Sequence, residues 1–433
     1  MDQKTAEMWL KVIQGSEKLS WSLWMAPIMQ SRQLTAEGKN DVLRILSILP
    51  ELFGDSWIEK CFRCKHPIVS LRYSPQNDVP SVYYQLLTLS LQLTLLNKTP
   101  GIKQVMKNLF RNLEDINWHH ALLQMETAAL ALQSGHSAFR LESSENGVDV
   151  DMVLALEGQN IYFEMVSMGT DQVYRWTSAY WQAITDLSLQ LRIQYDVNLT
   201  GHMGDQIDNE QDLREWITNN ATWRLNLQLW LHEIEQRAID VAKTGKECRI
   251  STPFGGKLVL SVKPLPVGET FLTGSALTQN EWNRVEARIR DKARQTIRLN
   301  CVWIRMDDLG ALWRLTHWAQ LPLNERLTMI VPLIQEALAP YSHISGMVIS
   351  NHFDWQPVSM KIEKWVWHDC GAAIRIPFGD GRFKETIVVC RGASAHRDMA
   401  LLLDWYEREA TWLDWALSQH GYAPFQEIFS AKG

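Results

Sequence analysis

Three acidic residues in the middle of the chain interrupt sequence that is otherwise typical of buried β-strands. Asp149 and Asp151 alternate with the apolar residues of 148–154, and Glu164 follows the apolar run 161–163. Because side chains alternate between the two faces of a strand, we expect Asp149 and Asp151 on one face. Carboxylates inside apolar strands cost free energy unless they are compensated, and a divalent cation is one such compensation.

Residues 147–167 are predicted to form two neighbouring strands joined by a turn at Glu157-Gly158-Gln159-Asn160. A helix over residues 119–133 is expected before them, and it carries Glu126 on an apolar face. A short strand near residues 138–141 is expected between that helix and the hairpin. The predicted order is therefore a helix followed by three strands.

This order, with an acid on the helix and on the second and third strands, resembles the restriction-endonuclease-like, or PD-(D/E)XK, nuclease superfamily. The resemblance covers residues 119–167 and 280–306. It implies phosphodiester hydrolysis of DNA or RNA with Mg²⁺ or Mn²⁺, which would lower the pKa of an attacking water. By position, Asp151 (or Asp149) and Glu164 would bind the metal, and Glu126 would assist. Defence against foreign nucleic acid is a role associated with that family.

The chain departs from the family pattern at one position. The family lysine, two residues after the motif glutamate, falls at Val166. Valine can neither orient a water nor stabilise charge on a phosphoryl oxygen. Arg175 or Lys292 could replace the lysine. The alternative is a catalytically degenerate nuclease fold that acts as a binding or scaffold module in a protein assembly.

A basic helix is expected over residues 284–298, and it resembles the second core helix of that superfamily. Its apolar stripe consists of Val285, Ile289, Ala293 and Ile297. Its cationic residues, which could contact nucleic-acid phosphates, are Arg284, Arg288, Arg290, Lys292, Arg294 and Arg298. The alternative is a solvated surface with ion pairs.

The acidic residues also have less specific interpretations. Asp149, Asp151 and Glu164 could line the wet face of an antiparallel hairpin. Glu126 could form a local ion pair with His119, His120 or an arginine. A third interpretation is a protein unrelated to nucleases, with a chance carboxylate hairpin. A structure in which the strands at 148–156 and 160–167 do not share a sheet beside the 119–133 helix would select it.

The whole chain predicts an α/β fold in three parts. These are a helical N-terminal domain over 1–115, a restriction-endonuclease-like mixed-sheet core over 116–310 with a helical insertion at 170–250, and a C-terminal α/β extension over 311–433. Further helices are expected at 171–197, 209–219, 221–242, 309–318 and 323–338, and further strands at 257–262, 299–306, 344–350 and within 361–391.

Composition limits the function classes. The net charge of −6 over 433 residues does not favour nucleic acid, so binding would need a local basic face. Six cysteines predict no disulfide framework and a reducing cytoplasm. The apolar run 82–96 is interrupted by polar residues and predicts a buried helix, with no membrane partner. The 20 tryptophans are expected in the core or at an interface with a protein partner or a second copy.

Overall fold

A computed structural model describes most of the chain. The described residues are 3–64, 66, 68, 80–111, 115–168, 172–202, 220–253, 255–262, 272–273, 281–308, 322–353, 363–377, 383–392, 396–408 and 412–429. The chain divides into two compact units. Unit 1 comprises Met1–Gly169 and Trp282–Gly433, and unit 2 comprises Thr170–Glu281. The predicted helices at 209–219 and 309–318 lie outside the described residues.

The N-terminal part of unit 1 is helical, as the sequence predicts. Its helices are α1 (Gln3–Ile13), α2 (Trp21–Met29), α3 (Ala36–Leu46), α4 (Ile48–Cys64), α6 (Pro80–Leu96), α7 (Ile102–Arg111) and α8 (Asp115–Gln133). Their apolar side chains and those of one sheet face form a single core cluster. No helix within the described residues combines the length and the apolar character needed to cross a bilayer.

An eight-stranded mixed sheet forms the centre of unit 1, in the order β1-β2-β3-β8-β9-β12-β11-β10. The strands are β1 (Phe139–Glu145), β2 (Val148–Leu156), β3 (Gln159–Met168), β8 (Val302–Asp308), β9 (Ile344–Phe353), β10 (Glu363–His368), β11 (Gly371–Pro377) and β12 (Phe383–Cys390). Strands β3, β8 and β9 are parallel, and the other neighbours are antiparallel. Strands from the predicted core and the predicted C-terminal extension thus join one sheet.

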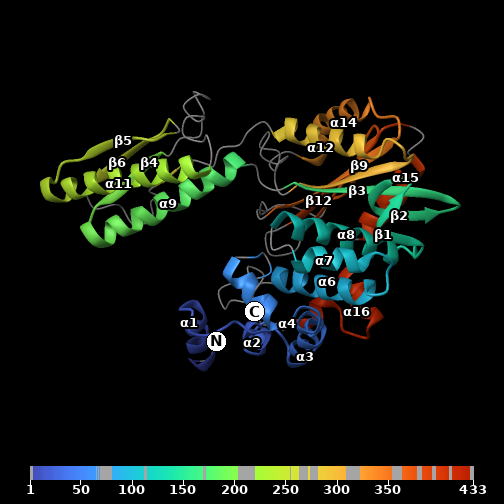
Figure 1. Ribbon diagram of the computed structural model, residues 1–433, viewed down its shortest axis with the longest axis horizontal. Helices are drawn as coiled ribbons and strands as arrows, with labels where there is room; N and C mark the ends of the chain where they lie inside the picture. Colours follow the sequence, from blue (N-terminus) through green and yellow to red (C-terminus); the bar gives the residue numbers. More distant parts are fainter. Residues whose placement is uncertain are drawn as a thin grey trace. The chain divides into compact units, whose positions relative to one another are not determined.

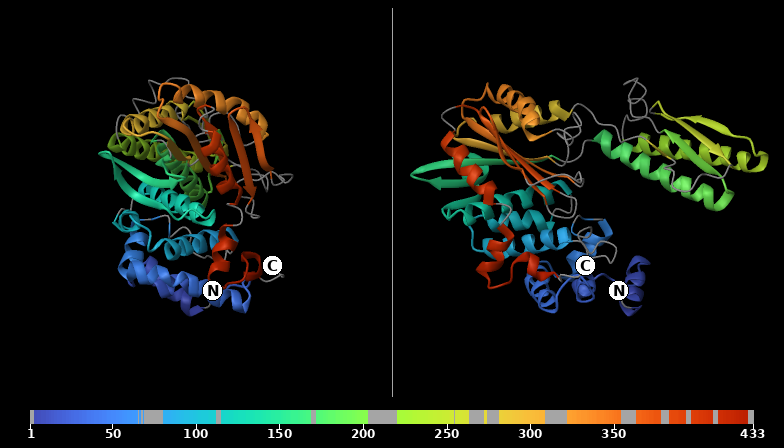
Figure 2. Two further views of the ribbon diagram at one scale, coloured as in Figure 1. Left: turned by 90° about the vertical axis from the view of Figure 1, so that its right-hand side faces the viewer. Right: turned by 180° about the vertical axis from the view of Figure 1, so that it is seen from behind.

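Helices cover both faces of this sheet (Figures 1 and 2). On one face lie α8 and α15 (His396–Arg408), whose apolar residues belong to the first core cluster. On the other face lie α12 (Glu281–Gln295) and α14 (Leu323–Leu338), which form a second cluster with the strands. The chain ends with α16 (Trp412–Gln419) and the short helix η4 (Phe425–Ile428). The sheet is therefore the middle layer of three.

Unit 2 interrupts unit 1 between β3 and α12. It contains α9 (Gln172–Tyr195), β4 (Asn198–His202), α11 (Asn220–Thr244), β5 (Cys248–Ser251), β6 (Lys257–Ser261) and β7 (Leu272–Thr273), with the sheet order β5-β6-β4-β7. The sequence predicted a helical insertion over 170–250, but strands β4 and β5 also lie in this range, whereas the strand expected at 257–262 is present as β6. Strand β4 is only five residues long, too short for its alternation to stand out beside the long helix before it.

The predicted hairpin is present. Strands β2 and β3 pair antiparallel from Leu156↔Gln159 to Met152↔Phe163, and α8 packs on β3. Glu157 and Gly158 both have positive φ, at 49° and 81°, as a two-residue type I′ turn requires. The arrangement that would have selected a protein unrelated to nucleases, with the two strands in different sheets, is therefore not found.

Candidate active site

Strand register aligns three acids across β1, β2 and β3. The turn Asn146-Gly147, with φ of 53° and 75°, sets β1 against β2. Glu142 stands opposite Asp151, between the pairs Leu141↔Met152 and Ser143↔Val150. On the other side of β2, Asp151 is one residue beyond the last pair with β3, Met152↔Phe163, so its register partner is Glu164.

Strand β2 leaves the β3 ladder at Asp151. The backbone N–H of Met165 donates instead to the side chain of Asp151, with N to Oδ2 at 2.6 Å. Met152 belongs to the core on the α8 side, whereas Val148 and Val150 belong to the core on the α12 side. The simple alternation expected from the sequence is therefore wrong here, because the strand turns over at Asp151. This position gives the Asp151 carboxylate access to both layers of helices.

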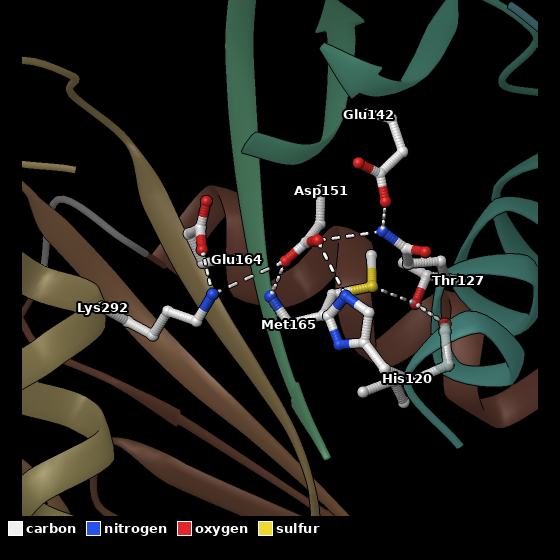
Figure 3. Close-up of polar contacts among 9 residues, drawn as sticks. His120, Thr127, Glu142, Asp151, Glu164, Met165 and Lys292 are labelled. Carbon is white, nitrogen blue, oxygen red and sulfur yellow. Dashed lines mark hydrogen bonds and ion pairs between the residues drawn. The ribbon is translucent and has the colours of Figure 1, made fainter. Parts of the chain in front are cut away.

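Lys292 of α12 joins the two central acids. Its Nζ lies 2.7 Å from Oε2 of Glu164 and 4.0 Å from Oδ2 of Asp151. Figure 3 shows the lysine reaching from its helix toward both carboxylates. The side chain of Glu164 is only 3% exposed and that of Asp151 12%. We call Asp151, Glu164 and Lys292 the acid–lysine cluster.

Burial and mutual charge separate the titration of the two acids. Burial, and next the charge of Asp151, raise the pKa of Glu164 to about 7, although Lys292 opposes this shift. Burial also opposes ionisation of Asp151, but hydrogen bonds and charges from His120, Lys292 and the Met165 N–H lower its pKa. Burial disfavours the ammonium of Lys292, yet the two acids raise its pKa. Near pH 7 Asp151 is therefore ionised and Lys292 is protonated. Glu164 is divided between its protonated and ionised forms.

Helix α8 supplies a second set of contacts to Asp151, on the side away from Lys292 (Figure 3). His120 Nε2 lies 3.0 Å from Asp151 Oδ1. Gln124 Nε2 donates to the same oxygen at 2.9 Å and to Glu142 Oε1 at 2.6 Å. Burial opposes protonation of His120, but its hydrogen bond with Asp151 and the charge of that acid raise its pKa. His120, Glu142 and Asp151 offer ligand atoms that all lie within 4.8 Å of one another.

A cavity of about 500 Å³ lies beside the cluster. Its walls are His120, Met165, Val166, Ser167, Arg288, Asp291, Lys292, Arg294 and Gln295. Within the described residues, β3 has no strand partner on this side from Glu164 onward, because β2 has left the ladder. Asp151 and Glu164 do not line the cavity, but His120, Met165 and Lys292, which contact them, do. Three cations against one acid on α12 make this cavity suitable for an anionic group.

The basic helix forms over residues 281–295, and its apolar stripe is confirmed at Val285, Ile289 and Ala293, which are fully buried. Ile297 is 68% exposed because the helix ends at Gln295, so that part of the stripe was wrong. Of the predicted cationic residues, the structure brings three to the cavity, namely Arg288, Lys292 and Arg294. Arg284, Arg290 and Arg298 do not line it.

The structure places two other predicted site residues away from the cluster. Asp149 is exposed on β2 and is not among the groups that could share a cation. Glu126 forms an ion pair with Arg305, at 3.0 Å, and another with Lys384. The alternative predicted for Glu126, an ion pair with an arginine, is therefore found. The backbone of Arg175 belongs to α9 in unit 2.

Three residues around Asp151 were not singled out as site residues from the sequence: His120 and Gln124 on α8, and Glu142 on β1. His120 and Gln124 are four positions apart, which puts them on one helix face. The position of Glu142 opposite Asp151 could have been predicted from the Asn146-Gly147 sequence, because a two-residue hairpin turn fixes the register of the two strands that it joins.

No protein-family model, no curated protein and no solved structure matches this chain.

Proposed function

We propose that this protein hydrolyses phosphodiester bonds in DNA or RNA with a divalent cation, Mg²⁺ or Mn²⁺, on a restriction-endonuclease-like core. The observation that carries the proposal is the convergence of Asp151, Glu164 and Lys292 beside a cationic cavity at the open edge of β3. Nuclease chemistry needs acids to hold the ion and a cation to stabilise phosphoryl charge.

The donor set fits the proposed ion. Asp151 and Glu164 offer carboxylate oxygens, which Mg²⁺ and Mn²⁺ prefer, and the pair already accommodates one cation, the ammonium of Lys292. When bound, the ion lowers the pKa of a water and polarises the phosphoryl oxygen.

The chain's own residues have separate tasks in this proposal. The Met165 N–H and His120 hold the Asp151 carboxylate in position through hydrogen bonds to its two oxygens. Lys292 supplies the positive charge that Val166 does not supply. Arg288 and Arg294 on the cavity wall attract the phosphate backbone and orient it.

One observation favours the alternative, a degenerate fold used as a binding module. Val166, at the position of the family lysine, is 6% exposed and packs in the apolar core on the α12 side. In that case the cavity would still bind nucleic acid, but no bond would be cleaved. The nuclease and the binding module would therefore both bind nucleic acid, but only the nuclease would cleave it.

The test incubates the full chain with single- and double-stranded DNA and RNA and with Mg²⁺, Mn²⁺ or a chelator. We expect metal-dependent cleavage that is lost in Asp151→Asn and Glu164→Gln. Asp149→Asn is the matched control, because Asp149 is an exposed acid on the same strand. Cleavage that survives in both cluster variants would overturn the assignment, and binding without cleavage by the native protein would select the binding module.

A further inference from the structure

We propose that His120, Glu142 and Asp151 form a second cation site, selective for a first-row transition-metal ion such as Mn²⁺ over Mg²⁺. The site shares Asp151 with the acid–lysine cluster but lies on the opposite side of that carboxylate (Figure 3). Its part in catalysis rests on the proposed nuclease function, whereas its capacity to bind a metal does not.

The spacing of the ligand atoms fits an octahedral ion. His120 Nε2 and Asp151 Oδ1 are 3.0 Å apart, and all three ligand atoms lie within 4.8 Å of one another. Two ligands at right angles around an ion with bonds of about 2.1 Å stand about 3.0 Å apart. Glu142 is exposed, so the ion can enter from solvent.

Gln124 provides an independent indication of a missing ligand. Its side chain is fully buried, and its Nε2 lies between Glu142 Oε1 and Asp151 Oδ1. Its Oε1 has no hydrogen-bond partner among the described residues. A buried acceptor without a hydrogen bond costs free energy, and a change in the orientation of the amide would relieve that cost. Half a turn of the amide brings Oε1 to the two acids, a position that a shared cation would stabilise.

The mixed donor set determines the class of metal. Mg²⁺ prefers oxygen ligands and retains several waters, whereas an imidazole nitrogen favours transition metals. The acid–lysine cluster offers oxygen ligands alone, so the two sites differ in selectivity. The register of β1 against β2 places Glu142 opposite Asp151, and its φ of 47° shows a left-handed backbone at this position of the strand.

The experiment titrates the full chain with Mn²⁺ and follows it by electron paramagnetic resonance. Pulsed spectra report whether a nitrogen is bonded to the ion. We expect nitrogen coupling in the native protein and in Glu164→Gln, in which the acid–lysine cluster is damaged. His120→Ala should remove the nitrogen coupling and lower the Mn²⁺ affinity of this site at least tenfold. Glu142→Gln should also lower the Mn²⁺ affinity. The neighbouring His119→Ala is the matched control and should retain the signal.

The outcomes separate this inference from the nuclease proposal. Absence of nitrogen coupling in the native protein, or its persistence in His120→Ala, would overturn the second site. Nitrogen-bonded Mn²⁺ in a protein that cleaves nothing would sustain the second site and reject the nuclease. Glu142→Gln changes one exposed side chain, so it keeps the test valid if His120→Ala is poorly folded.

Discussion

Lys292 Nζ contacts Oε2 of Glu164 at 2.7 Å, although the two residues are 128 positions apart in the sequence. The lysine comes from α12 and the acid from β3, and all of unit 2 lies between them in the chain. The contact therefore depends on the packing of α12 against the sheet, and the proposed nuclease function assigns to Lys292 the positive charge that the family motif carries at the position of Val166.

In the proposed nuclease, replacing Lys292 by methionine should strongly slow cleavage while the fold is retained. The variant keeps the length of the side chain but removes the charge beside Glu164 and the phosphate cavity. Loss of one preorganised charge of this kind lowers turnover by about 10²–10³-fold. Initial rates at saturating substrate measure the effect, and Lys243→Met, at the exposed end of α11, is the control. Unchanged turnover in Lys292→Met would show that this lysine has no part in the reaction.

Metal affinity of the acid–lysine cluster should rise with pH and level off above neutrality. Glu164 must lose its proton to bind a metal, and burial and Asp151 raise its pKa to about 7. Below that pH, the affinity should fall by about tenfold per pH unit, because binding releases one proton. Calorimetric titrations with Mg²⁺, to which the histidine-containing site should respond less, measure this slope. A flat profile between pH 5.5 and 8 would contradict the protonated Glu164.

The same shift makes Glu164 a stabilising group at low pH. Because the folded pKa of about 7 lies above the ordinary value of 4.5, its contribution is fully present below 4.5 and is lost as the pH rises through 7. In Glu164→Gln this pH dependence should be absent. Urea unfolding of both proteins between pH 5 and 8 makes the comparison, and parallel curves would disprove the shift.

Arg288 and Arg294, which line the cavity, should contribute to nucleic-acid binding, whereas Arg290, which does not line it, should contribute little. Arg288→Ala and Arg294→Ala should each weaken binding and reduce the salt dependence of log K by about one counterion. Arg290→Ala is the control, since Arg290 lies on the same helix but does not line the cavity. Fluorescence anisotropy at several salt concentrations measures the slopes. Equal losses of affinity in all three variants would show that the net charge of the helix, and not the cavity, determines nucleic-acid binding.

Local periodicity was sufficient to predict the elements that carry the cluster. The β2–β3 hairpin follows from alternation and from the turn at Glu157-Gly158, and the buried stripe of α12 follows from the helical repeat. Each signal lies within one short segment of the chain. The meeting of Asp151 and Glu164 could be anticipated for the same reason, because a single tight turn fixes their register.

Contacts between distant segments were not predictable in this way. Glu126 was expected to assist a metal, but its partners Arg305 and Lys384 come from β8 and β12 and reach it only when the sheet is assembled. At Asp151 the apolar side chains of β2 change from the core on the α12 side to the core on the α8 side. A regular two-residue period in the sequence cannot predict this change. Packing of α8 on the sheet brings His120 to Asp151, and local pattern does not encode that packing.

Replacing Glu126 by glutamine should affect stability and leave metal binding intact. The change removes the acid that compensates fully buried Arg305 and its neighbour Lys384. Removing one partner of a fully buried ion pair costs about 3–5 kcal/mol of unfolding free energy. We expect a smaller loss here, because the side chain of Glu126 is 23% exposed and water screens its charge. Urea unfolding and Mn²⁺ titration of the same preparation measure both properties. Normal stability with lost cleavage would return Glu126 to the catalytic role expected from the sequence.

A second buried ion group should be a main determinant of stability on the other side of the sheet. Glu385 of β12 accepts hydrogen bonds from Arg326 Nη1 at 2.8 and 2.9 Å and from Arg375 Nε and Nη2 at 3.1 and 2.9 Å. The three side chains are at most 4% exposed. Glu385→Gln leaves two buried guanidinium groups without this carboxylate, so we expect a loss of about 3–5 kcal/mol.

The control for Glu385→Gln is Glu233→Gln, which removes an acid from a pair with Arg237 that is about half exposed on α11. Exposed pairs of this kind contribute about 0.2–1 kcal/mol, because water screens the charges. Urea unfolding of the three proteins gives the two differences. If both variants lose the same small amount, the buried group does not stabilise the sheet, and the arginines must be compensated by other groups.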